Sequence, residues 1–373
     1  MKKTIFFAAA VVMLAACSKT KVADEMQAIT FDPNALATKA LILPDGNTPN
    51  QLEFPAAETF NVFAFADADG AGTDYATDYT HPLMSDVNIS KQSNIWKATS
   101  GTYLWPTTGT VDFYAYYPST ITATFVSDTE PKGLSLTGIS LGSTIGEQAD
   151  PLVGTAQAQA APSKPTVSLV FKHIASQIAV KAFDATTATT LQGKIHIKSV
   201  VFKNVKLSGD YRDGAGTTPA NIGKGSWSNW GISTNVTSFN GNVLLAVPTN
   251  EAPAPYLTTT ATSATITNTS AFVVVPAEIA DGENGPSIDV TYSIDAYELN
   301  NYNYPATPDQ AVNIALYGRV SNNEFMNGKR YIFNIGISLD GANNEITFSP
   351  LVDGWSTENI SGITIDAVNH VLL

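Results

Sequence analysis

Cysteine is almost absent from this chain of 373 residues, which holds a single one, Cys17. A lone thiol cannot form a disulfide within the chain, so the architecture of small disulfide-linked secreted domains is excluded. The fold must instead rest on buried apolar side chains. A chain of this length usually divides its apolar residues between two domains.

Charged residues are also scarce, at 14% of the sequence, whereas a typical soluble domain has about 25%. The 33 acidic residues outnumber the 20 basic ones, which gives a formal net charge of −13. A chain of this sign does not attract nucleic acid or an anionic membrane surface. Nucleic acid is therefore not an expected partner.

Residues that commonly carry chemistry are few as well. No two of the four histidines have metal-ligand spacing on a shared element: His81, His173, His196 and His370. The sequence has no nucleophile elbow, phosphate-binding glycine loop or zinc pattern. We therefore predict no catalytic residue, no metal site and no cofactor, and we do not expect an enzyme.

Long hydrophobic runs are missing too. The apolar stretch Ile5–Leu14 is much shorter than the roughly 20 residues that a membrane-spanning helix needs. Two lysines precede this stretch and small residues follow it. This order is typical of a secretory signal peptide, which we place at residues 1–16.

The residues that close this segment, Leu14-Ala15-Ala16-Cys17, resemble the lipobox of bacterial lipoproteins. That resemblance implies cleavage between Ala16 and Cys17 and lipidation of the Cys17 thiol. Several acyl chains would anchor the protein stably to a membrane, whereas one chain binds only marginally. The alternative is an ordinary signal peptide in which the cysteine is a coincidence.

What the sequence has in quantity is short runs in which apolar residues recur at every second position. Examples are Phe60–Phe65, Val111–Tyr117, Ile288–Ile294 and Tyr331–Ile337. This period, with turn residues between the runs, predicts β-strands, and no long helical period competes with it. The expected fold class is all-β.

A stretch rich in alanine, glutamine and proline, residues 147–166, interrupts this rhythm. Such a composition favours a domain boundary. We expect one β-sandwich domain over residues 40–160 and a second over residues 161–373.

A succession of short motifs resembles one known family. In chain order the motifs are Ile29-Thr-Phe31, Ala37-Thr-Lys39-Ala40, Phe60–Phe65, Tyr103-Leu-Trp-Pro106, Val111–Pro118, Asp150-Pro-Leu-Val153, Leu169–His173, Gly328–Phe333 and Val352–Trp355. The series resembles the Mfa-like fimbrillins, the type V pilus subunits of Bacteroidales, over nearly the whole chain. Each motif is short, so the resemblance rests on their order.

The resemblance implies two transthyretin-like β-sandwich domains in tandem and the function of a pilin that supports adhesion. It implies export as a lipoprotein to the outer membrane, followed by assembly into an extracellular fimbrium. The implied partners are other fimbrial subunits and, before processing, the membrane itself. Receptors on host or bacterial surfaces are a further class of partner to consider.

In that family a protease cuts after a basic residue behind the first strand, and a strand from a neighbouring subunit fills the vacated groove. The matching positions here are Lys39 and Ala40, although family members often have arginine at the cut. Residues 17–39 would then be lost, and Ile29 and Phe31 would belong to the displaced strand. Added strands bind through backbone hydrogen bonds, while alternate side chains set the register.

The last residues, 356–373, are a candidate donor strand for a neighbour. One face of this segment would be apolar if it were extended, because apolar residues recur along it. The candidate donor residues are Ile360, Ile363, Ile365 and Val368. The alternative is that the segment is simply the last strand of the C-terminal sandwich.

Two nearby tryptophans, Trp227 and Trp230, suggest a second function. Exposed aromatic rings at this spacing could stack on sugars, which would make the protein a permanently anchored, glycan-binding surface lipoprotein. Most tryptophans in all-β proteins pack in the core or at a sheet edge instead.

Overall fold

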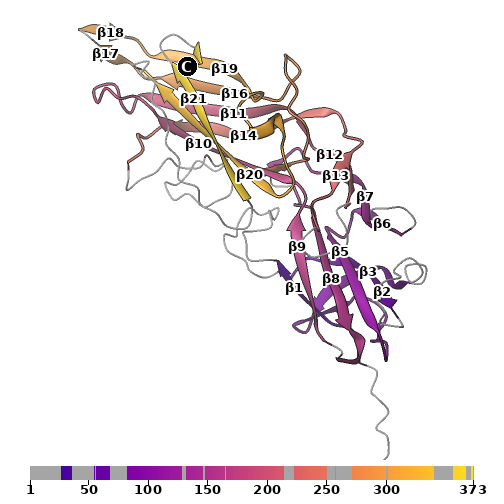
Figure 1. Ribbon diagram of the computed structural model, residues 1–373. Coiled ribbons are helices and arrows are strands. Elements are labelled where there is room, and N and C mark those ends of the chain that lie inside the picture. Colours follow the sequence, from indigo (N-terminus) through magenta and orange to yellow (C-terminus); the bar gives the residue numbers. More distant parts are fainter. Residues whose placement is uncertain are drawn as a thin grey trace, which may run out of the picture.

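A computed structural model describes the following residues: 27–35, 54, 56–67, 82–127, 132–145, 148–163, 165–213, 222–249, 257, 271–299, 301–339, 356–366 and 371–372. Over residues 356–372 it describes the backbone alone. Strands joined by turns and short 3-10 helices make up these residues, so the expected all-β class is confirmed. Figure 1 shows an elongated molecule with one β-unit at each end and a small sheet between them.

The N-terminal unit, here called the barrel, has seven strands. They are β1 (Phe31–Ala35), β2 (Phe60–Asp67), β3 (Pro82–Gln92), β4 (Ile95–Ala98), β5 (Thr110–Tyr117), β8 (Leu152–Ala160) and β9 (Val167–His173). Their order, β1-β4-β3-β2-β5-β8-β9, is closed, because β1 pairs with both β4 and β9. Every pairing is antiparallel except β1 with β9, which is parallel. Strand β1 thus closes the barrel by bridging β4 and β9.

Aromatic rings fill the barrel. The Phe54 ring lies 5.3 Å from the Phe60 ring, 5.5 Å from Trp96 and 5.4 Å from Phe171, measured between centroids. Most of these pairs meet edge to face, the arrangement that the ring quadrupoles favour. Because Phe60, Trp96 and Phe171 lie on strands far apart in the sequence, their contacts with Phe54 link distant parts of the barrel wall.

A four-stranded sheet, the connecting sheet, covers the outside of β2 and β5. Its strands, in the order β13-β12-β7-β6, are β6 (Thr122–Val126), β7 (Gly133–Ser140), β12 (Ser208–Arg212) and β13 (Ser226–Ser228). Phe125 on β6 lies 4.5 Å from the Phe65 ring and 4.7 Å from the Tyr114 ring. Strands β2 and β5 are therefore buried on both faces, which explains why their sequences are apolar at nearly every position.

The C-terminal unit, here called the sandwich, consists of two sheets. One has the strands β15 (Phe272–Val274), β10 (Ser176–Asp184), β20 (Lys329–Ser338), β21 (Ser356–Asp366) and β22 (Val371–Leu372), in that order. The other has β14 (Ser233–Leu244), β11 (Ile195–Lys206), β16 (Ser287–Ile294) and β19 (Thr307–Ala315). A separate hairpin consists of β17 (Tyr297–Leu299) and β18 (Tyr302–Tyr304), and two 3-10 helices, η2 (Ala161–Ser163) and η3 (Ser321–Asn323), lie in connections.

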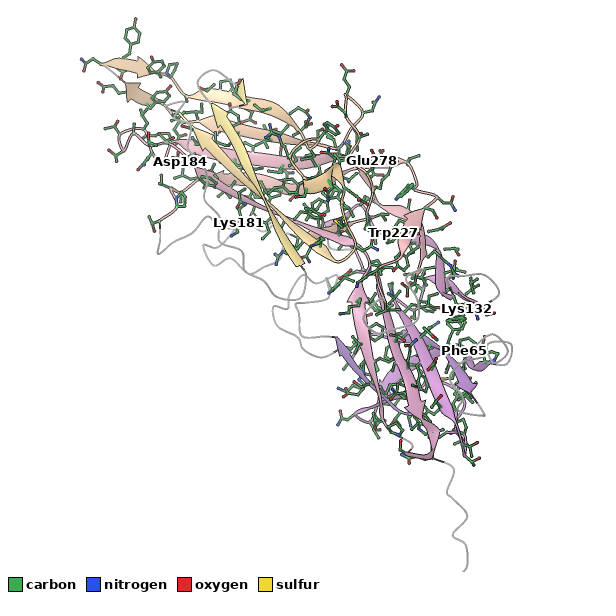
Figure 2. All side chains as sticks on the ribbon, viewed as in Figure 1. Phe65, Lys132, Lys181, Asp184, Trp227 and Glu278 are labelled. Atoms are coloured by element: carbon green, nitrogen blue, oxygen red, sulfur yellow. The ribbon has the colours of Figure 1, made fainter. Side chains whose placement is uncertain are left out.

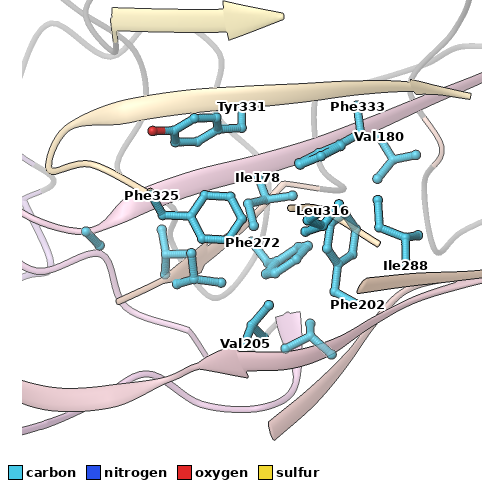
Figure 3. Packing of buried hydrophobic residues seen from close by; sticks show 14 of the residues in the cluster. Ile178, Val180, Phe202, Val205, Phe272, Ile288, Leu316, Phe325, Tyr331 and Phe333 are labelled. Carbon is cyan, nitrogen blue, oxygen red and sulfur yellow. The ribbon is translucent and has the colours of Figure 1, made fainter. Parts of the chain in front are cut away.

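The core of the sandwich lies between its two sheets (Figure 3). Phe202 of β11 lies 5.1 Å from the Phe272 ring and 5.3 Å from the Phe333 ring, and all three side chains are fully buried. This core is continuous with the residues under the connecting sheet, whereas the inside of the barrel is a separate cluster. The transthyretin-like topology stays a prediction.

The chain passes from barrel to sandwich at Ile174 and Ala175, between β9 and β10. The sequence-based boundary after residue 160 differs from this, because β8 and β9 pair with each other within the barrel. The stretch before residue 160 looked like a linker because its side chains are small or polar. Backbone pairing and local contacts make it a strand: Gln157 donates a hydrogen bond to the Tyr114 hydroxyl (3.2 Å), and the Ala158 N–H donates to Asp112 Oδ1 (2.7 Å).

We expect Phe202→Ala to lower the free energy of unfolding by about 3–5 kcal/mol, because it leaves a cavity beside the Phe272 and Phe333 rings. Asn240→Ala, an exposed position on the adjacent strand β14, should change it by less than about 0.5 kcal/mol. Urea unfolding followed by tryptophan fluorescence measures both. Equal effects of the two substitutions would show that Phe202 is not part of a tightly packed core.

Candidate functional site

The first strand of the barrel, which here means β1 and the preceding residues 27–30, is the strongest candidate for a functional element. The side chains of Ile29, Phe31 and Pro33 are buried, whereas the intervening Asp32 is exposed. The Phe31 ring meets the Phe113 ring at 5.7 Å, edge to face. Buried and exposed side chains thus alternate along the segment, and its apolar face forms part of the barrel core.

Hydrogen bonds hold this segment along both sides. The Ile29 N–H donates to the Tyr103 carbonyl (2.9 Å), and the Trp105 N–H donates to the Gln27 carbonyl (3.0 Å). On the other side, the Val167 N–H donates to the Thr30 carbonyl (2.8 Å), which starts the parallel pairing with β9. The segment therefore closes the barrel with its backbone as well as with its side chains.

Pro33 in the middle of β1 is explained by this geometry. Because Val167 donates to Thr30 in a parallel ladder, the N–H groups of residues 32 and 34 face β9, and position 33 faces away. On that side, β1 pairs with β4 only at Phe31, which lies opposite Trp96. A proline, which has no N–H, therefore costs no ladder hydrogen bond at this position.

Removal of the first strand would open a defined groove. Its floor would be the rings against which Phe31 packs, Phe60 and Phe113, and its walls would be the free backbone edges of β4 and β9. A groove with an apolar floor and unpaired strand edges suits an extended peptide with alternating apolar side chains. Left empty, the same edges would promote aggregation.

The C-terminal segment lies at the edge of the sandwich in this structure. Strand β21 pairs in parallel with β20, with Ile360, Ile363 and Ile365 opposite Phe333, Ile335 and Ile337. On its other side it pairs only with the two residues of β22. The segment is therefore a peripheral strand of its own subunit here, and its donation to a neighbour stays a prediction.

Several predicted site residues lie outside the described residues. They are Ala16 and Cys17 at the signal cleavage site, Lys39 and Ala40 at the processing site, and Val368 in the donor segment. Lipidation and processing at these positions stay predictions.

The expected pairing of Trp227 with Trp230 as a sugar-stacking platform is not present. Trp227 is buried, only 7% exposed, and its ring packs against Tyr211, whereas Trp230 is 46% exposed. Figure 2 places Trp227 between the barrel and the sandwich. The sequence interpretation fails here because the strand β13 turns Trp227 inward, under the connecting sheet.

Trp227 instead stabilises the crossing, the point between β9 and β10 where the chain passes from the barrel to the sandwich. Its indole Nε1–H donates to the Ile174 carbonyl (2.9 Å) and to Asn327 Oδ1 (3.1 Å). The Asn327 amide in turn donates to the Gly225 carbonyl (2.7 Å), and the Gly328 N–H donates to the Ala175 carbonyl (2.9 Å). We call Ile174, Ala175, Trp227, Asn327 and Gly328 the junction clasp.

A buried carboxyl lies close to this clasp, at the end of β12. Burial raises the pKa of Asp213 to about 6, and the neighbouring hydrogen bonds and Arg212 offset only part of that effect. The Tyr211 hydroxyl donates to Asp213 Oδ1 (3.2 Å), and the Gly225 N–H donates to the Tyr211 hydroxyl (2.9 Å). The Asp213 N–H also donates to the Leu134 carbonyl (2.9 Å), which links β12 to β7.

Within the described ranges, no group of three or more His, Cys, Asp or Glu side chains could hold a metal ion. In the same residues, no helix has the length and apolar character needed to cross a bilayer.

The chain matches the model of the fimbrillin-like family over residues 38–355. The chain belongs to the fimbrillin-like family. A search of curated proteins finds no match to this fimbrillin-like chain.

The chain is similar to solved structures of two Bacteroides proteins. A fimbrial protein from Bacteroides vulgatus ATCC 8482 superposes with a TM-score of 0.54 at 16% identity, over 84% of this chain and 96% of that one. A candidate cell adhesion protein from Bacteroides uniformis ATCC 8492 is 14% identical over 83% of this chain and 93% of that one, with a TM-score of 0.44. The first likeness shows that the fimbrillin-like chain and that fimbrial protein have the same fold.

Sequence reasoning missed the groove and the clasp of this fimbrillin-like chain. Trp96, Phe113 and Val167 contact or pair with the first strand, but each is more than sixty residues away from it in the sequence. Asn327 lies in an ordinary turn sequence before β20, and only its hydrogen bonds mark it. No local sequence pattern predicts contacts between residues so far apart in the chain.

We expect Trp227→Phe to lower the free energy of unfolding by about 1–3 kcal/mol, because the buried Ile174 carbonyl and Asn327 amide oxygen both lose a donor. Trp230→Phe removes a comparable bond, to the Pro276 carbonyl, at a half-exposed site where water can replace it, so its effect should be smaller. Chemical unfolding of the two variants gives the comparison. A larger effect at Trp230 would contradict the clasp.

The pKa of Asp213 predicts a pH dependence of stability. The folded-state pKa of about 6 lies above the ordinary 3.8, so the folded chain binds this proton more tightly than the unfolded chain. The contribution of Asp213 to the free energy of unfolding is complete below about pH 4 and is lost as the pH rises through about 6. Two pKa units correspond to about 3 kcal/mol at most.

Asp213→Asn should therefore remove a fall in stability between about pH 4 and pH 7, as measured by urea unfolding at several pH values. Asp210→Asn is the matched control: its exposed carboxyl accepts hydrogen bonds from Asn229 and Gly138, which lower its pKa. The Asp210→Asn variant should keep the fall in stability between about pH 4 and pH 7. An unchanged slope in Asp213→Asn would mean that another group titrates.

Proposed function

We propose that this protein is a structural subunit, a pilin, of a cell-surface fimbria that polymerises by strand exchange after proteolysis. The observation that carries the proposal is the first strand, which fills the barrel core with Ile29 and Phe31 and bridges β4 and β9. Membership of the fimbrillin-like family supports a fimbrial subunit at the cell surface. The function is structural and requires no catalysis.

The proposed route begins at the signal peptide, residues 1–16, and passes through a lipoprotein held at the outer membrane by Cys17. Cleavage between Lys39 and Ala40 then separates residues 17–39 from the rest of the chain. Since β1 (Phe31–Ala35) lies within that segment, the cut frees both the lipid anchor and the strand that closes the barrel. One cleavage would thus release the subunit and open its groove.

The C-terminal segment is the proposed donor. In Ile363-Thr-Ile365 it repeats the apolar spacing of Ile29-Thr-Phe31, so its side chains could occupy the same two positions in the barrel core. Because β21 and the two-residue β22 form the edge of their sheet, the segment can leave the sandwich without removing an internal strand. Burial of each isoleucine would contribute about 1.5–3 kcal/mol.

The directions of the strands favour a head-to-tail fibre. Strand β10 begins at the crossing, and β20 and β21 run parallel to it, so β21 points away from the barrel. Strand β9 ends at the crossing, and β1 runs parallel to it, so β1 points from the far end of the barrel toward the sandwich. A donor strand can therefore leave one subunit and enter the next without reversing its direction.

A permanently anchored glycan-binding protein was the alternative suggested by the two tryptophans. The burial of Trp227 removes the platform on which that function depended. Adhesion to host or bacterial receptors through a fimbria remains part of the proposed function, with the fibre presenting the subunit.

A peptide of residues 356–373 should bind the chain that has been cut after Lys39 but not the uncut Lys39→Ala variant, because β1 still occupies the groove of the variant. Fluorescence anisotropy of the labelled peptide measures the affinity. Ile363→Asp with Ile365→Asp in the peptide should weaken binding by at least about 100-fold, since two charges would enter an apolar core.

The matched control peptide carries the same two charges on the opposite face, as Gly362→Asp with Thr364→Asp. It should bind far more tightly than the first variant. Equal affinity of the two variants would contradict register-specific insertion, and binding of the peptide to the uncut chain would contradict the groove as the site.

A further inference from the structure

Strands β9 and β10 follow each other along the chain in the same direction and join the barrel to the sandwich. Figure 1 shows β9 pointing from the barrel toward the sandwich, where the chain continues through Ile174 and Ala175 into β10. Strand β10 then pairs in parallel with β20 over eight residues, from Gln177 opposite Arg330 to Asp184 opposite Ile337. These strands run along the long axis of the molecule.

The parallel pairing of β10 with β20 determines how these two strands respond to tension. If β10 is pulled at its beginning and β20 at its end, the two strands must slide past each other, and all the hydrogen bonds between them resist together. If both are pulled from the same end, the bonds break one after another and each resists alone. The same ladder is therefore strong in shear and weak in peeling, because the unfolding barrier depends on how many bonds break at once.

We propose that this subunit is a tension-bearing element whose β10–β20 ladder is loaded in shear. This inference rests on the proposed function, because tension along the axis arises when subunits are linked head to tail. A neighbour's strand beside β9 would pull on the barrel from its far end, and the chain after β20 would pull from the opposite end of the molecule. That is the shear direction of the ladder.

The junction clasp fits the same function. Gly328 and Asn327, just before β20, bind the Ala175 carbonyl and Trp227, and the Ser176 hydroxyl donates to the Met326 carbonyl (2.8 Å). The beginning of β20 is thus attached to the beginning of β10 at the point where force enters the sandwich. Bending at the crossing, which would turn shear into peeling, is opposed by these bonds.

Single-molecule pulling of one chain tests the proposal without a fibre. Cys17→Ser removes the only natural cysteine, and Lys39→Ala keeps the first strand in place. Ser163→Cys, exposed at the far end of β9, paired with Asn343→Cys, which follows β20, applies shear. Thr189→Cys, exposed just after β10, paired with the same Asn343→Cys applies peeling.

At equal loading rate the shear pair should need at least about twice the rupture force of the peeling pair, since forced unfolding follows the height of the barrier crossed. Thr108→Cys, a second exposed attachment point at the far end of the barrel, should reproduce the shear force when paired with Asn343→Cys. Thermal melting of each variant checks that the fold is intact.

Equal forces in the two geometries would overturn the proposal, as would a higher force in peeling. The result is independent of assembly: a chain that resists shear but never polymerises would contradict the proposed function alone. A chain that polymerises through its C-terminal strand but shows no directional strength would contradict only the tension-bearing role.

Discussion

The backbone edge of β9 is the constraint on which the N-terminal half depends. A strand in a closed barrel needs a partner on each side, and β9 has β8 on one side and only β1 on the other. Unpaired N–H and C=O groups beside an apolar core raise the free energy of the folded state, and they pair readily with strands of other chains. This chain meets the requirement with its own first strand. In the proposed fibre, a second molecule would meet the same requirement at the same place.

The sandwich has the opposite arrangement, because its replaceable strand lies at an edge rather than in a closed wall. Strand β21 extends a sheet that already contains β15, β10 and β20, and the buried rings of Phe202, Phe272 and Phe333 lie on strands that precede it in the sequence. The subunit therefore combines a site that requires a strand with a segment whose loss leaves the core residues in place. This asymmetry is what a linear polymer needs.

The alternating runs of the sequence were enough to predict the fold class, because strand formation and side-chain alternation are local properties. The boundary predicted after residue 160 differs from the strand pairing, because the end of β8 is held by contacts with Asp112 and Tyr114, on a neighbouring strand. Trp227 was misread for the same reason: its burial depends on Ile174 and Asn327, which are 53 and 100 residues away. Pairing over such separations leaves no pattern in a single sequence.

The proline in the first strand has a consequence for the outer edge of the barrel. On the side of β1 that faces away from β9, pairing with β4 stops at Phe31, and Pro33 offers no N–H beyond that point. A passing chain therefore finds no donor at position 33, so the proline protects this edge against unwanted strand addition while the pairing with β9 is unaffected.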